Sequence, residues 1–373
     1  MTDQIALVPT HDEASRQNFV GSLKGFVNFA VESRLQSVFD AKLVPSFKAE
    51  FGRDPATRDE AQSLLEAHPL YQFWATMTFH SQNLLWETVG CTTARTLPEQ
   101  TERVNRLINN SQKLGTVDLR DENIAPAPVR TVEIHRQPGG YLRETFPGDV
   151  SAALTYMGSV ELYRNAKGMG TGAKAGADDF GRFLASVAQR RAPDLVPQTI
   201  LDMGCGTGEQ TLAYKRVFPA AEVTGIDCAR PFVRFAHALA EGEGLAMHFS
   251  HMDANQTSFE DESFDLIVSI ILFHETSNAQ VQKILQESWR LLRPGGLVLH
   301  LDVPYQPHRM SLVKQVTNHW QVRNNGEPFW TGFVEMDMME QLLQAGFEPD
   351  TAFCDYENLG EGAYLVFGGR KSK

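Results

Sequence analysis

A short apolar run that ends in closely spaced glycines constrains the fold of this chain more than any other feature. The run covers residues 199–203 and is followed by Gly204, Gly206 and Gly208. This pattern predicts a buried strand leading to a turn, where glycines leave room for the backbone to touch a ligand. A second apolar run, residues 221–227, ends in Asp227. An acid at that place accepts hydrogen bonds from ribose hydroxyls in nucleotide-type cofactor sites.

The spacing of the glycines indicates which class of cofactor the turn could bind. Nicotinamide- and flavin-binding folds favour G-x-G-x-x-G, which holds a pyrophosphate at the N-terminus of the next helix. Here the order is G-x-G-x-G, which lets the backbone approach an amino acid and a sugar but offers less to a diphosphate. The alternative is that the glycines only tighten a strand-to-helix connection and that Asp227 is an ordinary turn acid.

In these features the chain resembles the class I S-adenosylmethionine (SAM) dependent methyltransferases. The resemblance covers roughly residues 150–373 and is sharpest over residues 199–302. The segments that resemble the family's successive motifs and strands are residues 202–208, 223–227, 251–254, 263–271 and 291–299. Five such features in the family's order are a specific signal, whereas a single glycine-rich turn is a weak one.

The resemblance implies a SAM site built from these segments. Asp227 would hold the ribose, and Asp253 would accept from the adenine amino group while its neighbours pack on the ring. Tyr156 and Tyr163 are seven residues apart on one predicted helical face, and an aromatic helix at this place often caps the cofactor; core packing is the alternative. The predicted cofactor-binding residues are Asp202, Gly204, Cys205, Gly206, Gly208, Asp227, Cys228, Met252, Asp253, Ala254, Ile270, Tyr156 and Tyr163.

Strands alternate with helices after residue 199, which predicts an α/β fold with a doubly wound, Rossmann-like parallel sheet. The ligand is expected outside the carboxyl edge of that sheet. By resemblance the sheet has seven strands, and the last strand runs antiparallel between its neighbours. Residues 347–356 and 362–368 are the predicted final two strands.

Residues 1–148 are predicted to form a mainly helical accessory domain, and residues 149–373 the SAM-binding domain. An apolar helix is expected between Pro69 and Gly90. Because its apolar face is wide and the helices are few, a homodimer contact is one way to cover that face, and core packing is the other.

Two further segments of this first part carry local predictions. A helix is expected over residues 19–43, ending before Pro45, because proline disrupts a helix interior. A strand is expected over residues 129–134, whose pattern is strand-like.

His274 is the candidate catalytic base. Methyl transfer from a sulfonium depends mainly on positioning and a dry site, but a hydroxyl acceptor also needs a base, which contributes about 10²- to 10⁴-fold. His274 directly follows the predicted fourth strand, and in small-molecule O-methyltransferases, which this region resembles, a histidine in a similar setting is the base. Glu275 and Thr276 stand where those enzymes usually carry aspartate and tryptophan. Glu275 is the candidate orienter of the histidine or binder of an ammonium group; the alternative for His274 is that it only shapes the pocket.

An insertion at about residues 303–345 is the predicted cover of the acceptor. Aromatic and polar residues are concentrated there, a combination that suits a small organic molecule; an aromatic satellite core is the alternative. The candidate acceptor-binding residues are Tyr305, His319, Arg323 and Trp330.

The composition of the chain argues against several classes of binding partner. The formal net charge of −12 argues against a nucleic-acid partner, because such binding neutralises phosphates with lysine and arginine. No apolar stretch approaches the roughly 18 residues that span a bilayer, and the first residues lack the basic start of a signal peptide. We therefore expect a cytoplasmic protein without a membrane partner. No metal is expected either, because the four cysteines are dispersed, and His248 and His251 would face opposite sides of a strand.

The sequence thus predicts a SAM-dependent methyltransferase for a small-molecule acceptor, with a hydroxyl as the first choice of acceptor. If the chain is an enzyme, the alternative is transfer to a nitrogen, carbon or sulfur atom of a small metabolite. A SAM-binding subunit without catalytic activity is the alternative outside them.

Overall fold

The computed structural model describes residues 5–120, 122, 124–165, 176–304, 306–360 and 362–372. It contains an eight-stranded sheet with the order β1-β4-β3-β2-β5-β6-β8-β7. The strands are β1 (Thr116–Asp118), β2 (Thr199–Met203), β3 (Glu222–Asp227), β4 (His248–His251), β5 (Phe264–Ile270), β6 (Leu292–Asp302), β7 (Ala352–Leu359) and β8 (Gly362–Arg370). The strands pair in parallel up to β6, and β8 runs antiparallel to both β6 and β7. The predicted Rossmann-like sheet with an antiparallel last strand is confirmed.

The sheet has one strand more than the seven predicted. The additional strand, β1, comes from the segment predicted to be helical and pairs with β4, with Thr116 opposite His248. Three residues are too few to show the alternation of polar and apolar side chains that marks a strand. A Cβ on the preceding Gly115 would lie 1.8 Å from the carbonyl oxygen of Met247, so a glycine is required where the chain enters the sheet.

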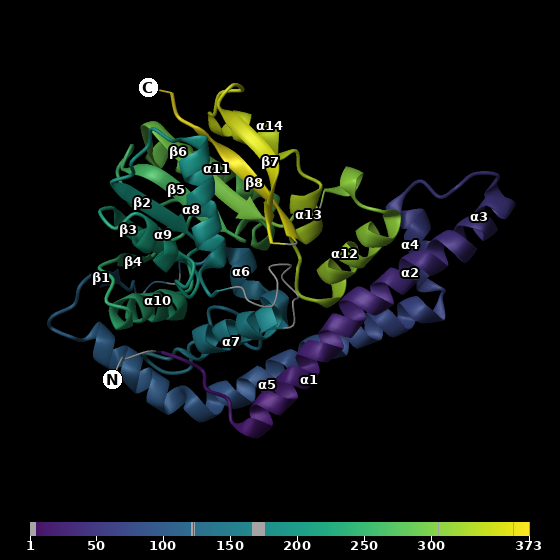
Figure 1. Cartoon of the computed structure of the whole chain (residues 1–373), viewed down its shortest axis with the longest axis horizontal. Coiled ribbons are helices and arrows are strands. Elements are labelled where there is room, and N and C mark those ends of the chain that lie inside the picture. The colour runs from purple at the N-terminus through teal and green to yellow at the C-terminus, as the bar shows by residue number, and fades with distance from the viewer. Residues whose placement is uncertain are drawn as a thin grey trace.

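Helices cover both faces of the sheet (Figure 1). One layer contains α8 (Asp179–Arg191), α9 (Thr211–Val217) and α10 (Arg230–Gly242); the other contains α11 (Asn278–Leu291) and α14 (Met338–Ala345). Along β2, Ile200 belongs to the core of the first layer and Leu201 to that of the second. Both side chains are fully buried. This alternation is the pattern of strands covered on both faces, and it leaves the carboxyl edge of the sheet to hold a ligand.

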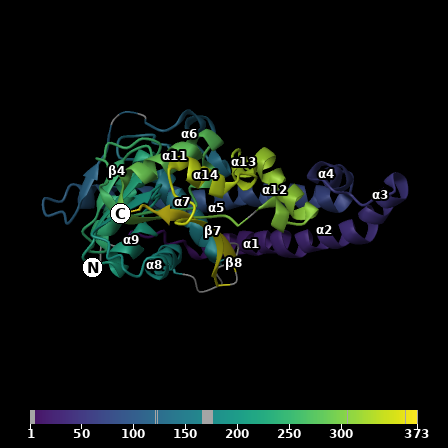
Figure 2. The ribbon, with the colours of Figure 1, turned by 90° about the horizontal axis from the view of Figure 1, so that it is seen from above.

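The N-terminal region forms a long helical arm that extends away from the sheet (Figures 1 and 2). The arm contains α1 (His11–Gly25), α2 (Glu32–Val38) and α3 (Val44–Phe51), joined by π-helical turns over Phe26–Val31 and Phe39–Leu43, and α4 (Arg58–Glu66). The predicted helix end before Pro45 is wrong. The N–H of Val44 donates to the carbonyl of Phe39, five residues back, and this wider turn lets the chain continue through a residue that has no N–H to donate.

The helix α5 (Pro69–Ile108) begins where the sequence predicted but continues past Gly90. Its second half carries Val104 and Leu107, which pack in one core with Phe232 and Phe235 of α10. This burial outweighs the cost of a glycine in a helix, about 1 kcal/mol. The strand expected over residues 129–134 is also wrong, because residues 127–131 form the short helix α6 (Ala127–Thr131).

The insertion after β6 packs on the helical arm. It contains α12 (Leu312–Asn324) and α13 (Trp330–Val334), which lie between the sheet and the arm in Figure 2. Trp320 of α12 meets Trp74 of α5 edge to face, with ring centroids 5.3 Å apart. Both rings belong to one core with residues of α2 and α4. The insertion and the first helices therefore share a core.

Replacing Trp74 with alanine will lower the free energy of unfolding by about 3–5 kcal/mol, because the indole is fully enclosed and its removal leaves a cavity. Its neighbour Phe73 is 46% exposed, so Phe73→Ala is a matched control that we expect to change stability little. Urea unfolding followed by circular dichroism measures both. Equal losses for the two variants would contradict this account of the shared core.

Four phenylalanines on α1, the first π-helical turn and α5 are between 46% and 63% exposed: Phe19, Phe26, Phe29 and Phe73. A second subunit would cover this surface, and the homodimer stays a prediction. Among the described residues, no helix combines the length and the apolar character that crossing a bilayer requires.

Candidate active site

The glycine turn after β2 is tied to the end of β3. The N–H groups of Gly204 and Cys205 both donate to the carbonyl of Ile226, at 2.8 and 2.9 Å. The N–H of Gly206 donates to Oδ2 of Asp227 at 3.0 Å, and the N–H of Ala229 donates to Oδ1 at 2.8 Å. Burial raises the pKa of Asp227 to about 6, although these backbone donors oppose the rise. The acid and the turn form one rigid unit.

Two glycines of the turn serve different purposes. Gly206 has a φ of 54°, and a Cβ placed on it would point into open space with no atom within 4 Å, so this is where backbone faces the pocket. Gly208 has a φ of 82°, and a Cβ there would lie 2.8 Å from Cβ of Ala236. Gly208 therefore lets α10 pack closely against the turn.

Asp202 and Cys205 support the turn from behind. Asp202 is 2% exposed and accepts a hydrogen bond of 2.7 Å from Oγ1 of Thr211, at the start of α9. Burial raises the pKa of Asp202 to about 7. The Cys205 side chain packs in the core of the first helical layer. Neither residue lines the pocket that the turn borders.

That pocket lies between the glycine turn, the acids at the ends of β3 and β4, and Glu275. The predicted cofactor-binding residues that line it are Gly204, Gly206, Asp227, Cys228, Met252, Asp253, Ala254, Ile270 and Tyr156. Sequence reasoning missed the opposite wall, which the segment from Pro126 to Tyr141 and the α10 residue Phe232 supply. The rings of Tyr141, Tyr156 and Phe232 lie 5.3–5.5 Å apart in each pair.

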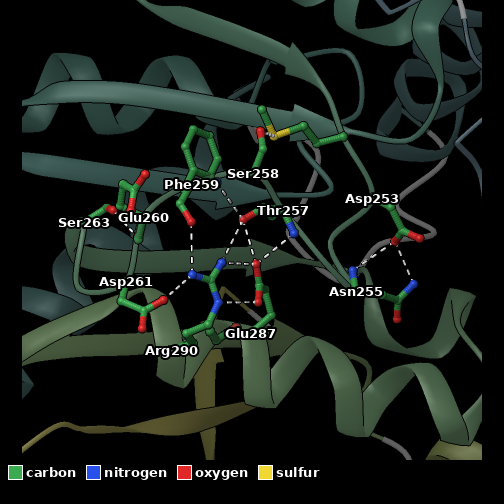
Figure 3. Close-up of polar contacts among 12 residues, drawn as sticks. Asp253, Asn255, Thr257, Ser258, Phe259, Glu260, Asp261, Ser263, Glu287 and Arg290 are labelled. Atoms are coloured by element: carbon green, nitrogen blue, oxygen red, sulfur yellow. Dashed lines mark hydrogen bonds and ion pairs between the residues drawn. The ribbon is translucent and has the colours of Figure 1, made fainter.

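The loop that carries Asp253 is fixed from below by Arg290 of α11 (Figure 3). Arg290 pairs with Glu287 on its own helix and with Asp261, and it donates to the carbonyl of Phe259. Asp253 itself accepts from the N–H and the side-chain amide of Asn255, at 2.9 and 2.6 Å. These contacts hold Asp253 at the pocket wall.

Tyr163, predicted to cap the cofactor, lies elsewhere. The helix α7 (Ser151–Asn165) turns its Tyr156 to the pocket, but the Tyr163 hydroxyl donates to Oε1 of Gln82 at 2.5 Å. The ammonium group of Lys24 donates to the same oxygen at 2.7 Å and lies 4.8 Å from the centre of the tyrosine ring. Tyr163 therefore joins α1, α5 and α7 rather than lining the pocket.

Burial lowers the pKa of Lys24 from 10.5 to about 7. Between pH 7 and pH 10.5 the unfolded chain therefore binds more protons than the folded chain, so the free energy of unfolding should rise with pH, by up to about 1.4 kcal/mol per pH unit. Urea unfolding at pH 7, 8 and 9 measures this rise, which we expect Lys24→Met to flatten. The exposed Lys42 gives a control, Lys42→Met, that should keep the wild-type slope. Parallel profiles for wild type and Lys24→Met would show that Lys24 is not the source.

The predicted base, His274, lies behind the pocket wall. It sits on the 3-10 turn Phe273–Glu275 after β5, is 2% exposed and does not line the pocket. Its Nδ1 lies 2.6 Å from Oδ1 of Asp302, a fully buried residue at the end of β6. The Trp330 ring packs edge to face on the imidazole, with centroids 5.0 Å apart. His274 is thus fixed in one orientation with Nε2 toward Glu275, 3.5 Å from Oε1.

Glu275 does line the pocket, and it is the centre of a polar cluster that we call the His–Glu cluster: His135, His274, Glu275 and Glu327. Nε2 of His135 lies 2.7 Å from Oε1 of Glu275, and Nδ1 of His135 contacts Glu327. The hydroxyl of Tyr141 donates to Glu275 at 3.4 Å. Burial alone would lower the pKa of His135, but Glu327 and Glu275 outweigh it and raise the pKa to about 10.

The backbone around His135 is shaped to place its ring in this cluster. His135 and Arg136 have φ angles of 53° and 61°, which non-glycine residues rarely adopt. The carbonyl of His135 accepts from the side chains of Gln82 and Trp86 on α5, at 3.0 and 2.8 Å. Its N–H donates to the carbonyl of Gly326. Two distant segments, α5 and the segment that contains Gly326, therefore fix one strained turn.

The structure separates the four residues predicted to bind the acceptor. Trp330 reaches the His–Glu cluster through His274. His319 contacts Thr331 at 3.1 Å, and Arg323 is exposed on α12; neither lines the pocket. Tyr305 lies outside the described residues. The order of the sheet, the glycine turn and the acids at the ends of its strands define a Rossmann-like methyltransferase domain.

Comparisons with known proteins agree with this class. A family model described as a methyltransferase domain matches residues 200–296. The demethylmenaquinone methyltransferase of Thermus thermophilus is 39% identical over 123 residues, 32% of this chain and 55% of that protein. A tRNA N(3)-methylcytidine methyltransferase of Drosophila melanogaster is 26% identical over 170 residues, 43% of this chain and 52% of that protein. The ubiquinone biosynthesis O-methyltransferase of Roseobacter denitrificans is 30% identical over 178 residues, 46% of this chain and 67% of that protein.

The chain belongs to the class I SAM-dependent methyltransferases, and its cofactor is SAM. It spans between about half and two thirds of the length of these relatives. The shared region is the sheet domain, because the family model begins in β2 and ends in β6.

Proposed function

We propose that this chain transfers the methyl group of SAM to an oxygen atom of a small organic acceptor bound beside Glu275. The observation that carries the proposal is that one pocket joins the glycine turn and strand-end acids on one wall to Glu275 on another. When bound, SAM supplies a methyl group on a positively charged sulfur, and the S–C electron pair stays on sulfur as the methyl group leaves.

The residues at the glycine turn fit SAM. Gly206 leaves open space for a ligand at the backbone. The Asp227 carboxylate accepts one backbone N–H on each oxygen, and a carboxylate has about four acceptor positions, so two remain for ribose hydroxyls. Met252 and Ile270 give the pocket apolar walls, which suit a planar base.

Glu275 is the residue we assign to contact the acceptor. A hydroxyl must lose its proton as its oxygen is methylated, so a group beside it must accept that proton or lower its pKa. The Glu275 carboxylate lies at the pocket wall, whereas His274 lies behind it. We therefore propose that His274 is a positioning residue: Asp302 holds its ring, and the ring orients Glu275.

Methylation of an amine is the second candidate. Three carboxylates, those of Glu275, Glu327 and Asp302, meet two histidines around this wall. An excess of acidic groups attracts an ammonium group. One relative is named a ubiquinone biosynthesis O-methyltransferase, which agrees with oxygen as our first choice, and another is named a C-methyltransferase, so the acceptor atom is decided by the test below.

Incubation of the purified chain with methyl-labelled SAM and fractionated metabolites, followed by mass spectrometry, tests the proposal. We expect a labelled small molecule whose new methyl group is on oxygen, together with release of S-adenosylhomocysteine. The label on nitrogen or carbon would refute the choice of acceptor atom. Binding of SAM without any labelled product, in extracts that contain the natural acceptor, would show a non-catalytic SAM-binding subunit instead.

A further inference from the structure

The His–Glu cluster has the composition of a transition-metal site. His135, His274, Glu275 and Glu327 each offer one ligand atom, and the four atoms lie within 4.8 Å of one another. Ligands of a tetrahedral zinc ion lie about 2.0–2.2 Å from the metal and therefore roughly 3.4 Å from each other. A small contraction of the cluster brings all four atoms to bonding distance of one ion.

Two carboxylate oxygens in the cluster are buried without a hydrogen-bond partner among the described residues. They are Oε2 of Glu275 and Oε2 of Glu327. Glu327 is 3% exposed. A buried carboxylate oxygen without a partner loses its hydration with no compensation. A metal ion between the two glutamates would supply that compensation, and it would displace a proton that His135 holds between their other oxygens.

The groups around the cluster hold its two histidines in the way that metal-binding histidines are usually held. Metal-binding histidines usually donate their other ring nitrogen to a carboxylate or a carbonyl, which fixes the ring. Nδ1 of His274 lies 2.6 Å from Asp302, which leaves Nε2 directed into the cluster. His135 is held in a rare backbone conformation by contacts to its N–H and its carbonyl. Strained residues of this kind persist where the surrounding structure fixes them, and they concentrate at functional sites.

We propose that the His–Glu cluster binds one divalent transition-metal ion, through one nitrogen each of His135 and His274 and one oxygen each of Glu275 and Glu327. Imidazole and carboxylate ligands suit zinc, iron, cobalt, nickel and manganese. Because Glu275 lines the pocket, the ion would adjoin the acceptor. This inference rests on the proposed function for its chemical role: a divalent cation lowers the pKa of an oxygen bound to it by several units, so an acceptor hydroxyl or enol bound to the ion ionises near neutral pH.

Metal binding is tested on the untagged full chain, independently of activity. We expect plasma mass spectrometry of the purified protein to find close to one transition-metal ion per chain. After removal of metal with a chelator, Zn²⁺ titration by calorimetry should show one site, and Co²⁺ should give the visible absorption bands of an ion with nitrogen and oxygen ligands. Glu327→Gln and His135→Gln should each weaken Zn²⁺ binding at least about tenfold.

A matched control is His248→Gln, because His248 lies on β4 outside the cluster and contacts Thr116. It should bind Zn²⁺ like the wild type. The proposal would be overturned if the wild type contained no metal and showed no saturable Zn²⁺ site. It would also be overturned if the Glu327→Gln and His135→Gln variants were folded and bound Zn²⁺ as the wild type does. Circular dichroism of each variant establishes folding.

Failure of this inference and failure of the proposed function give different results. Transfer of label to an acceptor by a chain that binds no metal would reject the metal site and keep the methyltransferase. One Zn²⁺ per chain, lost in Glu327→Gln, without transfer to any acceptor would support the metal site and reject the proposed reaction.

Discussion

Replacing Asp227 with alanine should weaken SAM binding by more than about 100-fold. Hydrogen bonds to a charged group are worth about 1.5–3 kcal/mol each, and the Asp227 carboxylate is placed to accept two from the ribose. The substitution also removes the bond from the N–H of Gly206 to Oδ2, which holds the glycine turn. Calorimetric titration with SAM and with S-adenosylhomocysteine measures the loss.

The control for this variant is Asp350→Ala, which removes an exposed acid shortly before β7. It should bind SAM as the wild type does. The thermal unfolding temperature of each variant without ligand shows whether the chain is folded. A folded Asp227→Ala variant whose affinity for SAM is within about threefold of the wild type would remove the basis for placing the ribose at this acid.

Replacing Glu275 with glutamine should lower kcat by about 10²- to 10⁴-fold, the usual contribution of a group that assists proton loss. Glutamine keeps the size of the side chain but removes the charge that faces His135 at 2.7 Å. Because Glu275 contacts the acceptor in our proposal, the dissociation constant of SAM should change only a few-fold. Single-turnover transfer of labelled methyl and calorimetry separate the two quantities.

Glu335→Gln is the matched control, because Glu335 pairs with Arg58 across the insertion and the arm and does not line the pocket. We expect wild-type turnover from it. Unchanged turnover in Glu275→Gln would exclude Glu275 from the reaction. A loss of SAM binding equal to the loss of turnover would instead place Glu275 at the cofactor.

Local patterns were sufficient to predict the half of the chain that holds the cofactor motifs. Helix α10 begins beside Pro231 and ends at Gly242, and α11 ends three residues before Pro294, because proline and glycine mark helix ends in the sequence. The glycine turn lies beside Asp227 as expected, since parallel strands bring their carboxyl ends to one edge. These features depend on residues that are close in sequence.

The elements that the sequence did not predict depend on tertiary contacts. Strand β1 exists because a three-residue segment finds an open edge at β4. Helix α5 passes Gly90 because its second half is buried against α10. Local propensity carries no information about either partner, and tertiary packing routinely overrides it.

The His–Glu cluster was missed for the same reason. Its members are separated by up to 192 positions, from His135 to Glu327, and only His274 and Glu275 follow a predicted strand. The local sequence around His135 contains a Pro-Gly-Gly turn, which indicates a bend but no chemistry. The one clue in the sequence was the glycine at position 326. The structure shows why it is needed: a Cβ there would lie 2.5 Å from the carbonyl oxygen of Glu133, so only glycine allows the two segments to approach.

The attachment of His135 to α5 has a consequence for engineering. Gln82 and Trp86 hold the carbonyl of His135, and the same helix carries Trp74 into the core it shares with the insertion. The side of the pocket that we propose to hold the acceptor is therefore assembled on a helix outside residues 200–296, the part of the chain that the methyltransferase-domain model matches. Transplanting the sheet domain alone onto another scaffold would carry over the methyl-donor half of the site and leave acceptor recognition behind.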